Sequence, residues 1–157
     1  MEEKEQITVL LAEDDDGHAR LIERGFEDAG LNNPLIRFKD GQETWDFISG
    51  KSKACSGPVP PYLLLLDIRM PNMDGLEVLR RVRSDRNFKD MPIAMLTTSD
   101  EPREIQRCYA LGCNSFFIKP LDVGELAAIF KLRLAPHKRA CSPAGAAANA
   151  PPAGQRG

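Results

Sequence analysis

The stretch LLLLDIRMPNMDG, residues 63–75, decides how this sequence folds. Its run of four leucines, bounded by turn residues, is typical of a strand buried on both faces, as in the interior of a parallel sheet. The run ends in Asp67, and burying a carboxylate costs free energy unless a partner compensates it. Asp67 is therefore either a polar residue that merely ends the strand or a residue at the open edge of a sheet, where chemistry takes place.

Outward from this stretch, short apolar runs alternate with amphipathic segments. On the first of these segments, Leu21, Ile22 and Phe26 are expected to face the core. The alternation predicts an α/β domain with a parallel sheet and helices on both of its faces. We expect strands at residues 7–12, 35–38, 62–67, 92–97 and 115–118. We expect helices at residues 16–29, 40–50, 75–84, 102–111 and 122–134, with a loop over residues 50–61.

Length and composition narrow the class of protein. At 157 residues with a formal net charge of −2, the chain fits one domain and gives no electrostatic case for binding nucleic acid or an acidic membrane. We expect residues 1–6 to be an acidic extension without a signal peptide, and no apolar run is long enough to span a bilayer. Four cysteines without metal-ligand spacing favour reduced thiols and a cytoplasmic location. Residues 135–157 are rich in Pro, Ala and Gly, so we expect a disordered tail after a domain over residues 7–134.

Polar side chains follow four of the expected strands. The first strand ends in Glu13 and Asp14, the third in Asp67, the fourth in Thr97 and the fifth in Lys119. Ligands bind beyond the carboxyl ends of the strands in open parallel sheets, so we expect these side chains at one edge. Carboxylates about 5 Å apart repel by about 3 kcal/mol per pair at an effective dielectric constant of about 20, and a hard divalent cation relieves that repulsion. The cluster Glu13, Asp14 and Asp67 therefore predicts a Mg²⁺ site, completed by a backbone carbonyl.

The chemistry open to such a site is phosphoryl transfer. Asp67 is able to attack phosphorus and form an acyl phosphate. The transfer depends on positioning and charge neutralisation, which Mg²⁺ and Lys119 would supply, while Thr97 would donate its hydroxyl to a phosphate oxygen. The sequence has no Gly-rich P-loop, so we expect a separate phosphodonor rather than ATP bound by the chain itself.

Each of these residues alone has a plainer interpretation. A lone aspartate after a strand is usually a loop residue, and a lone lysine before a proline usually lies on the surface. An acidic run such as residues 13–16 is also typical of helix caps, and we assign Asp15 and Asp16 to that role. The coincidence of acids, a hydroxyl and an ammonium at the ends of four strands favours the functional interpretation.

The order and spacing of these motifs resemble a known family, the receiver domain of response regulators in two-component signalling. The matching features are the pair Glu13-Asp14, the Asp67 segment ending in MPNMDG, Thr97 in MLTTSD and the pair Lys119-Pro120. The resemblance implies a flavodoxin-like (βα)5 fold whose five-stranded parallel sheet has the order 2-1-3-4-5. It also implies a single-domain response regulator, not an enzyme. Its phosphorylated state would change a protein-interaction surface on the fourth helix, fifth strand and fifth helix.

The resemblance further implies roles within the site. Asp67 would accept a phosphoryl group from the phosphohistidine of a sensor histidine kinase. Asp14, Asp67 and the main-chain carbonyl of Arg69 would hold Mg²⁺, with Glu13 acting through water. A cis Lys119–Pro120 peptide would aim the lysine.

One hydroxyl residue and one aromatic residue match the coupled switch pair of this family. In that pair, which would be Thr97 and Phe116 here, the hydroxyl turns to the phosphoryl group and the ring moves inward. Phe116 has no hydroxyl, so its switching would rest on packing. A ring at this position is also common as an ordinary core residue of an α/β sheet.

Three segments point to one branch of the family. Residues 38–48 (FKDGQETWDFI), 95–100 (MLTTSD) and 108–122 (CYALGCNSFFIKPLD) resemble the stand-alone receivers that partner bacterial phytochrome-type kinases. The expected partners are a sensor histidine kinase of that type and an unidentified downstream protein, with a second copy of the chain as a candidate for a homodimer. We expect neither nucleic acid nor a membrane as a partner.

Two residues depart from the common pattern of the family. Arg69, two residues after Asp67, is long and cationic, so its side chain would be able to cover a phosphoryl group. Thr98 is bulkier than the small residue often found after the switch threonine. Both would restrict an attacking water, and we hypothesise a comparatively long-lived phosphoryl group.

Two other functions fit parts of the sequence. An aspartyl-phosphate phosphohydrolase would use a similar scaffold, but it needs an aspartate as acid or base where this chain has Arg69. A flavodoxin-like flavin binder would need a Ser/Thr/Gly-rich phosphate cradle after the first strand, where this chain is acidic. Steady turnover of phosphate esters would favour the first alternative, and colour in the purified protein the second.

Overall fold

The computed structural model describes residues 6–54 and 61–132, in which strands and helices alternate. None of the helices in these two ranges is both long and apolar enough to cross a membrane. In chain order the elements are β1 (Thr8–Ala12), α1 (Asp16–Asp28), β2 (Leu35–Phe38), α2 (Gly41–Ala54), β3 (Tyr62–Asp67), α3 (Gly75–Arg83), β4 (Ile93–Thr97), α4 (Pro102–Ala110), β5 (Ser115–Ile118) and α5 (Val123–Phe130).

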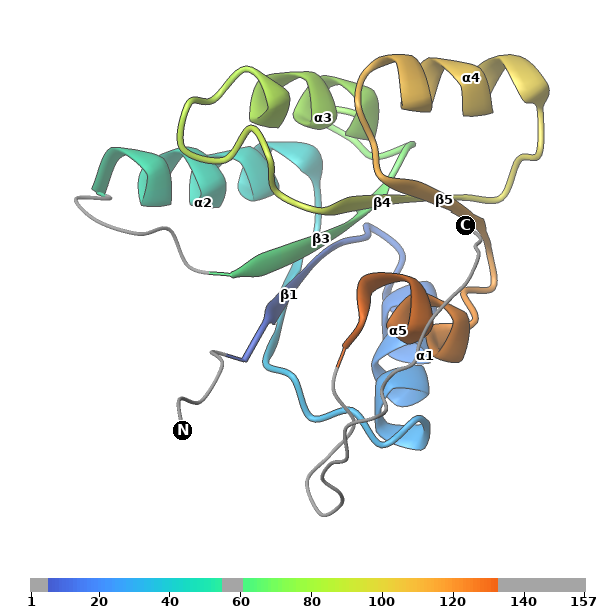
Figure 1. The fold of residues 1–157 in the computed structure, drawn as a ribbon. Helices are drawn as coiled ribbons and strands as arrows, with labels where there is room; N and C mark the ends of the chain where they lie inside the picture. Colours follow the sequence, from blue (N-terminus) through green and yellow to red (C-terminus); the bar gives the residue numbers. More distant parts are fainter. Residues whose placement is uncertain (1–5, 55–60, 133–157) are drawn as a thin grey trace.

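The strands form one parallel sheet in the order β2-β1-β3-β4-β5. In Figure 1, α2, α3 and α4 cover one face of this sheet, while α1 and α5 lie together against the other face. The predicted flavodoxin-like arrangement is thus confirmed, including its strand order.

The central strand β3 explains the leucine run. All of its residues are buried, and successive side chains enter opposite layers. Leu63 and Leu65 pack with α1 and α5, whereas Leu64 and Leu66 pack with α2, α3 and α4. Because side chains of a strand alternate between the two faces, a continuous apolar run serves both cores at once. The strand ends at Asp67, the first charged side chain after the leucine run.

Aspartates fix the starts of four helices. The side chains of Asp15, Asp40, Asp74 and Asp122 precede α1, α2, α3 and α5, and each accepts a hydrogen bond from the backbone N–H three residues further on. Such caps satisfy donors that the first helical turn leaves without a partner. Asp15 is therefore the cap of α1, and Asp16 is the first residue inside that helix.

One residue on α1 was assigned to the wrong face. The helix buries Ala19, Ile22 and Phe26, as its apolar spacing predicts, but Leu21 is 61% exposed. Adjacent residues of a helix point about 100° apart, so Leu21 turns toward solvent when Ile22 faces the sheet.

The predicted end of α2 at Gly50 was also wrong, because the helix continues to Ala54. The Ser52 hydroxyl donates to Asp85 Oδ1 at 2.9 Å, and Asn87 Nδ2 donates to the Ser52 carbonyl at 3.0 Å. These bonds to the turn after α3 stabilise the last helical turn, and the glycine signal alone could not reveal them.

The last helix is shorter than predicted. α5 ends at Phe130, where Lys131 adopts a left-handed conformation with φ of 56°. Leu132 donates its N–H to the Ala127 carbonyl at 2.9 Å and returns to the core. Leu134, the predicted end, lies outside the described residues.

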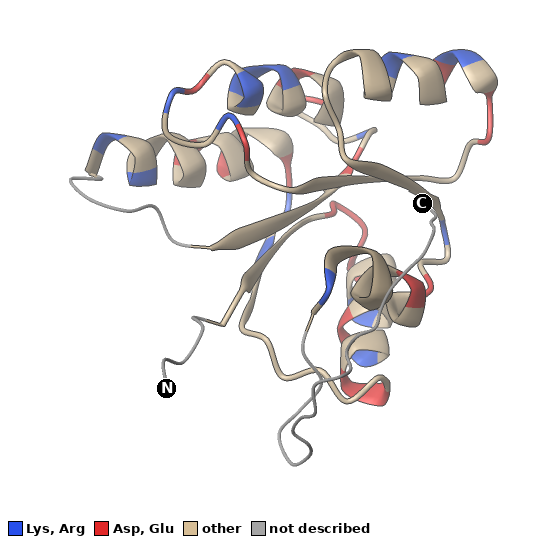
Figure 2. Ribbon diagram, in the orientation of Figure 1, with Lys and Arg blue, Asp and Glu red and all other residues tan. Residues whose placement is uncertain are grey.

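Charged residues are distributed unevenly over the fold. Figure 2 shows acidic residues in the loop after β1, at the carboxyl edge of the sheet. Lys and Arg residues occupy the last turns of α2 and α3, where they complement the negative ends of the helix dipoles. The acidic end of the molecule is therefore the edge at which the sequence places its candidate site.

Candidate functional site

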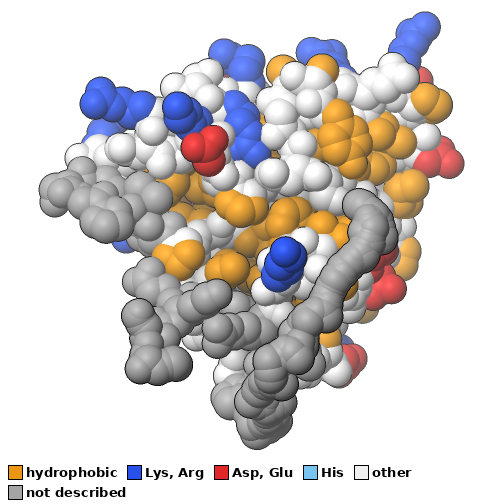
Figure 3. Space-filling view, viewed as in Figure 1, with side chains coloured by type: hydrophobic (Ala, Val, Ile, Leu, Met, Phe, Trp, Pro, Cys, Tyr) orange, Lys and Arg blue, Asp and Glu red, His pale blue; other side chains and the backbone are white. Residues whose placement is uncertain are grey.

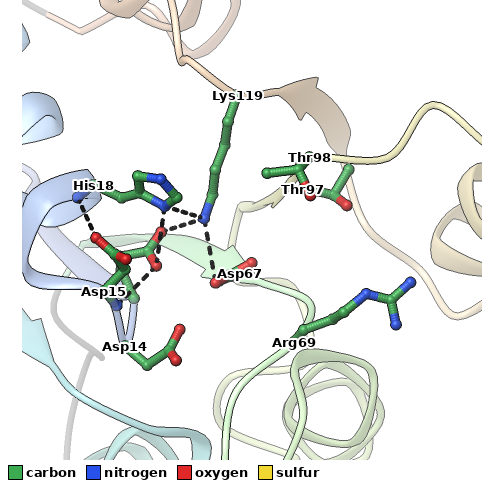
Figure 4. A pocket seen from close by; sticks show the side chains of 9 residues that line it. Asp14, Asp15, His18, Asp67, Arg69, Thr97, Thr98 and Lys119 are labelled. Atoms are coloured by element: carbon green, nitrogen blue, oxygen red, sulfur yellow. Dashed lines mark hydrogen bonds and ion pairs between the residues drawn. The ribbon is translucent and has the colours of Figure 1, made fainter.

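The strand ends enclose a small pocket at the carboxyl edge of the sheet, shown in Figure 4. Its volume is about 200 Å³. The residues that line it come from the loop after β1, the first turn of α1 and the ends of β3, β4 and β5: Glu13, Asp14, Asp15, His18, Asp67, Arg69, Thr97, Thr98 and Lys119. The predicted strand-end residues are thus brought together.

The four consecutive acids after β1 have different partners. Asp15 caps α1, accepting the His18 N–H at 2.9 Å. Asp16 accepts from Arg37 Nη1 at 2.7 Å and is drawn toward β2. Glu13 and Asp14 line the pocket without capping the helix, the cap Asp15 also lines the pocket, and Asp16, predicted to be a cap, is instead the first residue inside α1.

Glu13 and Asp14 differ in their surroundings. Glu13 is fully buried, its Oε1 lies 2.6 Å from Lys119 Nζ, and its Oε2 accepts the Asp15 N–H at 3.1 Å. Asp14 is exposed. Glu13 is therefore held by protein partners, while Asp14 keeps its carboxylate accessible to a ligand in the pocket.

The geometry and charge of three carboxylates suit a hard divalent cation. One oxygen from each of Glu13, Asp14 and Asp67 lies within 4.8 Å of the other two. Lys119 is the cation that pairs with Glu13 and Asp67, and one ammonium does not compensate a cluster of three carboxylates. An oxygen-only donor set with excess negative charge fits Mg²⁺ or Mn²⁺.

Asp67 ends β3 with its carboxylate almost covered. Its side chain is 9% exposed, and its Oδ2 lies 3.3 Å from Lys119 Nζ. Burial disfavours the charged form, and the nearby Glu13 carboxylate adds repulsion, so the pKa of Asp67 rises from 3.8 to about 7. The attraction of Lys119 lowers this pKa but does not offset the two larger effects.

Lys119 reaches the pocket from the end of β5. The Lys119–Pro120 peptide is cis, as the resemblance implies. In Figure 4, Nζ lies between Glu13, Asp67 and the imidazole of His18, whose Nδ1 is 3.2 Å away. The same Nδ1 of His18 lies 3.8 Å from Glu13 Oε2.

His18 is a pocket residue that the sequence analysis missed. The signal was its place three residues after the cap Asp15, which puts its side chain in the first turn of α1, beside the strand ends.

Thr97 and Phe116 lie on adjacent strands and point to the same face of the sheet. Phe116 is paired with Met95, two residues before Thr97, and it packs half-buried against the core under α2, α3 and α4. Thr97 is buried, and its Oγ1 accepts the Ser99 N–H at 3.0 Å. The two side chains therefore lie on the same face of neighbouring strands, near the carboxyl edge of the sheet.

Arg69 does not cover the pocket in this structure. Its guanidinium Nη2 lies 2.8 Å from Glu104 Oε2 on α4, and its side chain is 71% exposed. Figure 4 shows the side chain directed away from Asp67. The expectation that Arg69 shields a phosphoryl group is therefore not met in this conformation. Thr98 is exposed at the rim.

The loop after β3 is fixed by close backbone contacts. A Cβ on Gly75 would lie 2.2 Å from the Asp67 carbonyl oxygen, so only glycine fits there. Asn72, with φ of 69°, donates from Nδ2 to Asp40 Oδ2 at 2.6 Å. These contacts hold the turn that follows Asp67 and carries Arg69.

Comparison with known proteins identifies the family. The family model of the response regulator receiver domain matches residues 9–131. The chain belongs to this family, and the resemblance seen in its motifs is confirmed.

Three solved or curated relatives illustrate the likeness. A response regulator receiver domain from Rhodospirillum rubrum is 37% identical, with 82% of this chain and 96% of that chain covered and a TM-score of 0.70. The bacteriophytochrome response regulator AtBRR is 31% identical, with 82% and 92% covered and a TM-score of 0.69. Response regulator Rcp1 of Synechocystis sp. is 29% identical over 75% of this chain and 80% of its own length. A structure of the Mn²⁺-bound form of Rcp1 matches at 28% identity, with 76% and 85% covered and a TM-score of 0.63. The likeness to the phytochrome-associated receivers is thereby confirmed.

Proposed function

We propose that this protein is a single-domain response regulator in which Asp67 is the phosphoacceptor. An Asp67 carboxylate oxygen attacks the phosphorus of a kinase phosphohistidine, the P–N bond breaks as the P–O bond forms, and the imidazole nitrogen leaves. The observation that carries the proposal is the Asp67 carboxylate itself, which ends β3 in the pocket 3.3 Å from the Lys119 ammonium. Membership of the receiver family supports the same role.

The proposed cofactor is Mg²⁺, which when bound would neutralise negative charge between the carboxylates and the incoming phosphoryl group. Asp14, Asp67 and the main-chain carbonyl of Arg69 would hold it, with Glu13 acting through water. The clustering of the three carboxylates supports this assignment, as does the Mn²⁺-bound form of the relative Rcp1.

The remaining pocket residues have complementary proposed roles. Lys119 would donate to the phosphoryl oxygens, and the Thr97 hydroxyl would leave the Ser99 N–H and turn toward them. Phe116 would follow that movement by repacking on β5. The affected surface would be that of α4, β5 and α5, where Tyr109, Ile118 and Ile129 are large and about half exposed.

That surface is apolar enough to bind a protein. Figure 3 shows hydrophobic side chains gathered on the side of the molecule formed by α4 and β5. On α5, Leu126 is fully buried and cannot contribute to this surface, whereas Ile129 is 48% exposed. The downstream protein, or a second copy of this chain, would bind here.

We further propose a phytochrome-type histidine kinase as the phosphodonor, because a bacteriophytochrome response regulator is among the similar structures. Accepting a phosphoryl group from such a kinase would place the protein in the cytoplasm. Residues 7–134 would form the receiver unit, which agrees with the family match over residues 9–131, and residues 1–6 and 135–157 would lie outside it.

Phosphorylation of the intact chain tests the proposal. The protein is incubated with Mg²⁺ and phosphoramidate, or with an autophosphorylated phytochrome-type kinase, and its intact mass is measured. One acid-stable, base-labile phosphoryl group per chain is expected, and it should be absent from Asp67→Asn and retained in Asp100→Asn, whose exposed carboxylate lies outside the pocket. Incorporation into Asp67→Asn equal to that of the wild type would refute the assignment.

The same experiment separates a receiver from a phosphohydrolase. A hydrolase would release phosphate from many esters continuously and would need an acid or base two residues after Asp67. Arg69 holds that position, and its side chain is paired with Glu104. For a receiver we expect one phosphoryl group per chain, followed by slow release of phosphate at the rate at which phospho-Asp67 hydrolyses.

A further inference from the structure

Arg37 joins the edge strand β2 to the acidic loop after β1. Its Nε and Nη2 donate to the Glu13 carbonyl at 3.0 and 2.7 Å, and its Nη1 donates to Asp16 Oδ1 at 2.7 Å. Its side chain is 18% exposed, so the two bonds to the carbonyl are largely shielded from water. Arg37 lies outside the pocket, and neither the motifs nor the proposed chemistry uses it.

These bonds complete a clamp on one residue. The Glu13 N–H already donates to the Phe38 carbonyl at 3.1 Å, so both main-chain polar groups of Glu13 are held by the end of β2. The Glu13 carbonyl belongs to the peptide that leads into Asp14. Fixing that peptide plane therefore limits the directions in which the Asp14 side chain can leave the backbone.

We propose that Arg37 is a positioning residue for the cation site. It fixes the Glu13–Asp14 peptide so that the Asp14 carboxylate stands beside those of Glu13 and Asp67, and it holds the Asp16 carboxylate away from them. The inference rests on the proposed function, because it needs the cation that the three carboxylates would bind.

A purely electrostatic role for Arg37 predicts the opposite behaviour. A guanidinium near a cation site repels the cation, so removing its charge would tighten Mg²⁺ binding. Losing the clamp instead frees the loop and weakens binding, because groups that orient a ligand typically contribute about 10- to 100-fold in metal affinity. The sign of the change therefore distinguishes the two roles.

The experiment measures Mg²⁺ affinity by titration calorimetry of the full-length protein. Arg37→Gln removes the guanidinium group and its charge. Arg37→Lys keeps a positive charge, but an ammonium cannot make the two bonds to the Glu13 carbonyl and the bond to Asp16 in the planar geometry of a guanidinium. We expect Arg37→Gln to raise the Mg²⁺ dissociation constant about 10-fold and Arg37→Lys to raise it severalfold. The control is Arg24→Gln on α1, because Arg24 is exposed and makes no hydrogen bond or ion pair within the described residues. Its affinity should equal or slightly exceed that of the wild type.

A second readout separates positioning from loss of folding. The rate of phosphorylation by phosphoramidate is followed as Mg²⁺ increases, and the Mg²⁺ concentration at half-maximal rate should rise in Arg37→Gln while the maximal rate is retained. Should Arg37→Gln fail to fold, Arg37→Lys carries the test at constant charge. Unchanged or tighter Mg²⁺ binding by Arg37→Lys would overturn the proposal. A wild-type protein that binds no Mg²⁺ would instead reject the cofactor assigned under the proposed function.

Discussion

Replacing Asp67 by Asn should stabilise the folded protein when no divalent cation is present. In the pocket, Asp67 is buried beside the Glu13 carboxylate, and these two effects raise its pKa from 3.8 to about 7. Asparagine keeps the shape of the side chain and removes its charge. The substitution therefore relieves a penalty that the folded wild type carries at neutral and alkaline pH.

The magnitude follows from the shift in pKa. A shift of about three units corresponds to about 4 kcal/mol at about 1.4 kcal/mol per unit. The pocket is open to water and Asp67 keeps its contact with Lys119, so screening reduces the expected gain to about 1–2 kcal/mol. The raised pKa belongs to the folded state, so the wild type carries the full penalty above about pH 7, loses it progressively as the pH falls from about 7 to about 4, and carries none below that.

Urea unfolding in EDTA, repeated at several pH values, measures the effect. At about pH 8 the free energy of unfolding of Asp67→Asn should exceed that of the wild type by about 1–2 kcal/mol, and the difference should vanish near pH 4. Mg²⁺ at about 100 times its dissociation constant should stabilise the wild type by about 2.7 kcal/mol but not Asp67→Asn, and so reverse their order. Asp100→Asn, which removes an exposed carboxylate outside the pocket, should behave as the wild type does both in EDTA and in Mg²⁺. If Asp67→Asn is less stable than the wild type at about pH 8 in EDTA, the attraction of Lys119 outweighs burial and repulsion, and the argument fails.

Two further predictions concern the loops around Asp67. Glu104→Gln should release Arg69 from α4 and let it reach the phosphoryl group, lengthening the lifetime of phospho-Asp67 about fivefold, equivalent to about 1 kcal/mol. Radiolabel loss would measure this, and an equal effect in the double variant with Arg69→Ala would contradict it. Gly75→Ala should destabilise the fold by about 2–3 kcal/mol because its Cβ would meet the Asp67 carbonyl, as measured by thermal unfolding. Gly50→Ala in α2, where a Cβ meets nothing, should stabilise by about 0.5–1 kcal/mol, and equal losses in both would refute the steric argument.

The sequence was sufficient for the fold because its strongest signals are local. The leucine run, bounded by turn residues, is typical of a doubly buried strand, and the alternation of strands with capped helices permits few sheet topologies. The juxtaposition of Asp14, Asp67 and Lys119 then follows, since the carboxyl ends of parallel strands share one edge. No contact between these residues needed to be known in advance.

The features that the sequence did not reveal depend on contacts between distant segments. α2 continues past Gly50 because Ser52 bonds to Asp85, 33 residues away in the chain. Arg69 is drawn from the pocket by Glu104, 35 residues away, on a helix whose rotation no local pattern fixes. A polar residue within the apolar strand LIRF was a signal for Arg37, but its partner could be identified only once β2 lay beside β1.

The distribution of charge in the pocket connects its stability with its proposed function. Lys119 lies between Glu13 and Asp67 and cannot neutralise both, and Asp14 adds a third carboxylate within 4.8 Å. A cation bound there would reduce the repulsion among these carboxylates. A phosphoryl group on Asp67 would add negative charge to the same pocket and attract Lys119 more strongly. The phosphoryl group and the Glu13 carboxylate would therefore compete for the Lys119 ammonium. We therefore expect Lys119 Nζ to move away from Glu13 when Asp67 is phosphorylated, because the phosphoryl oxygens would offer it more negative charge than the Asp67 carboxylate does.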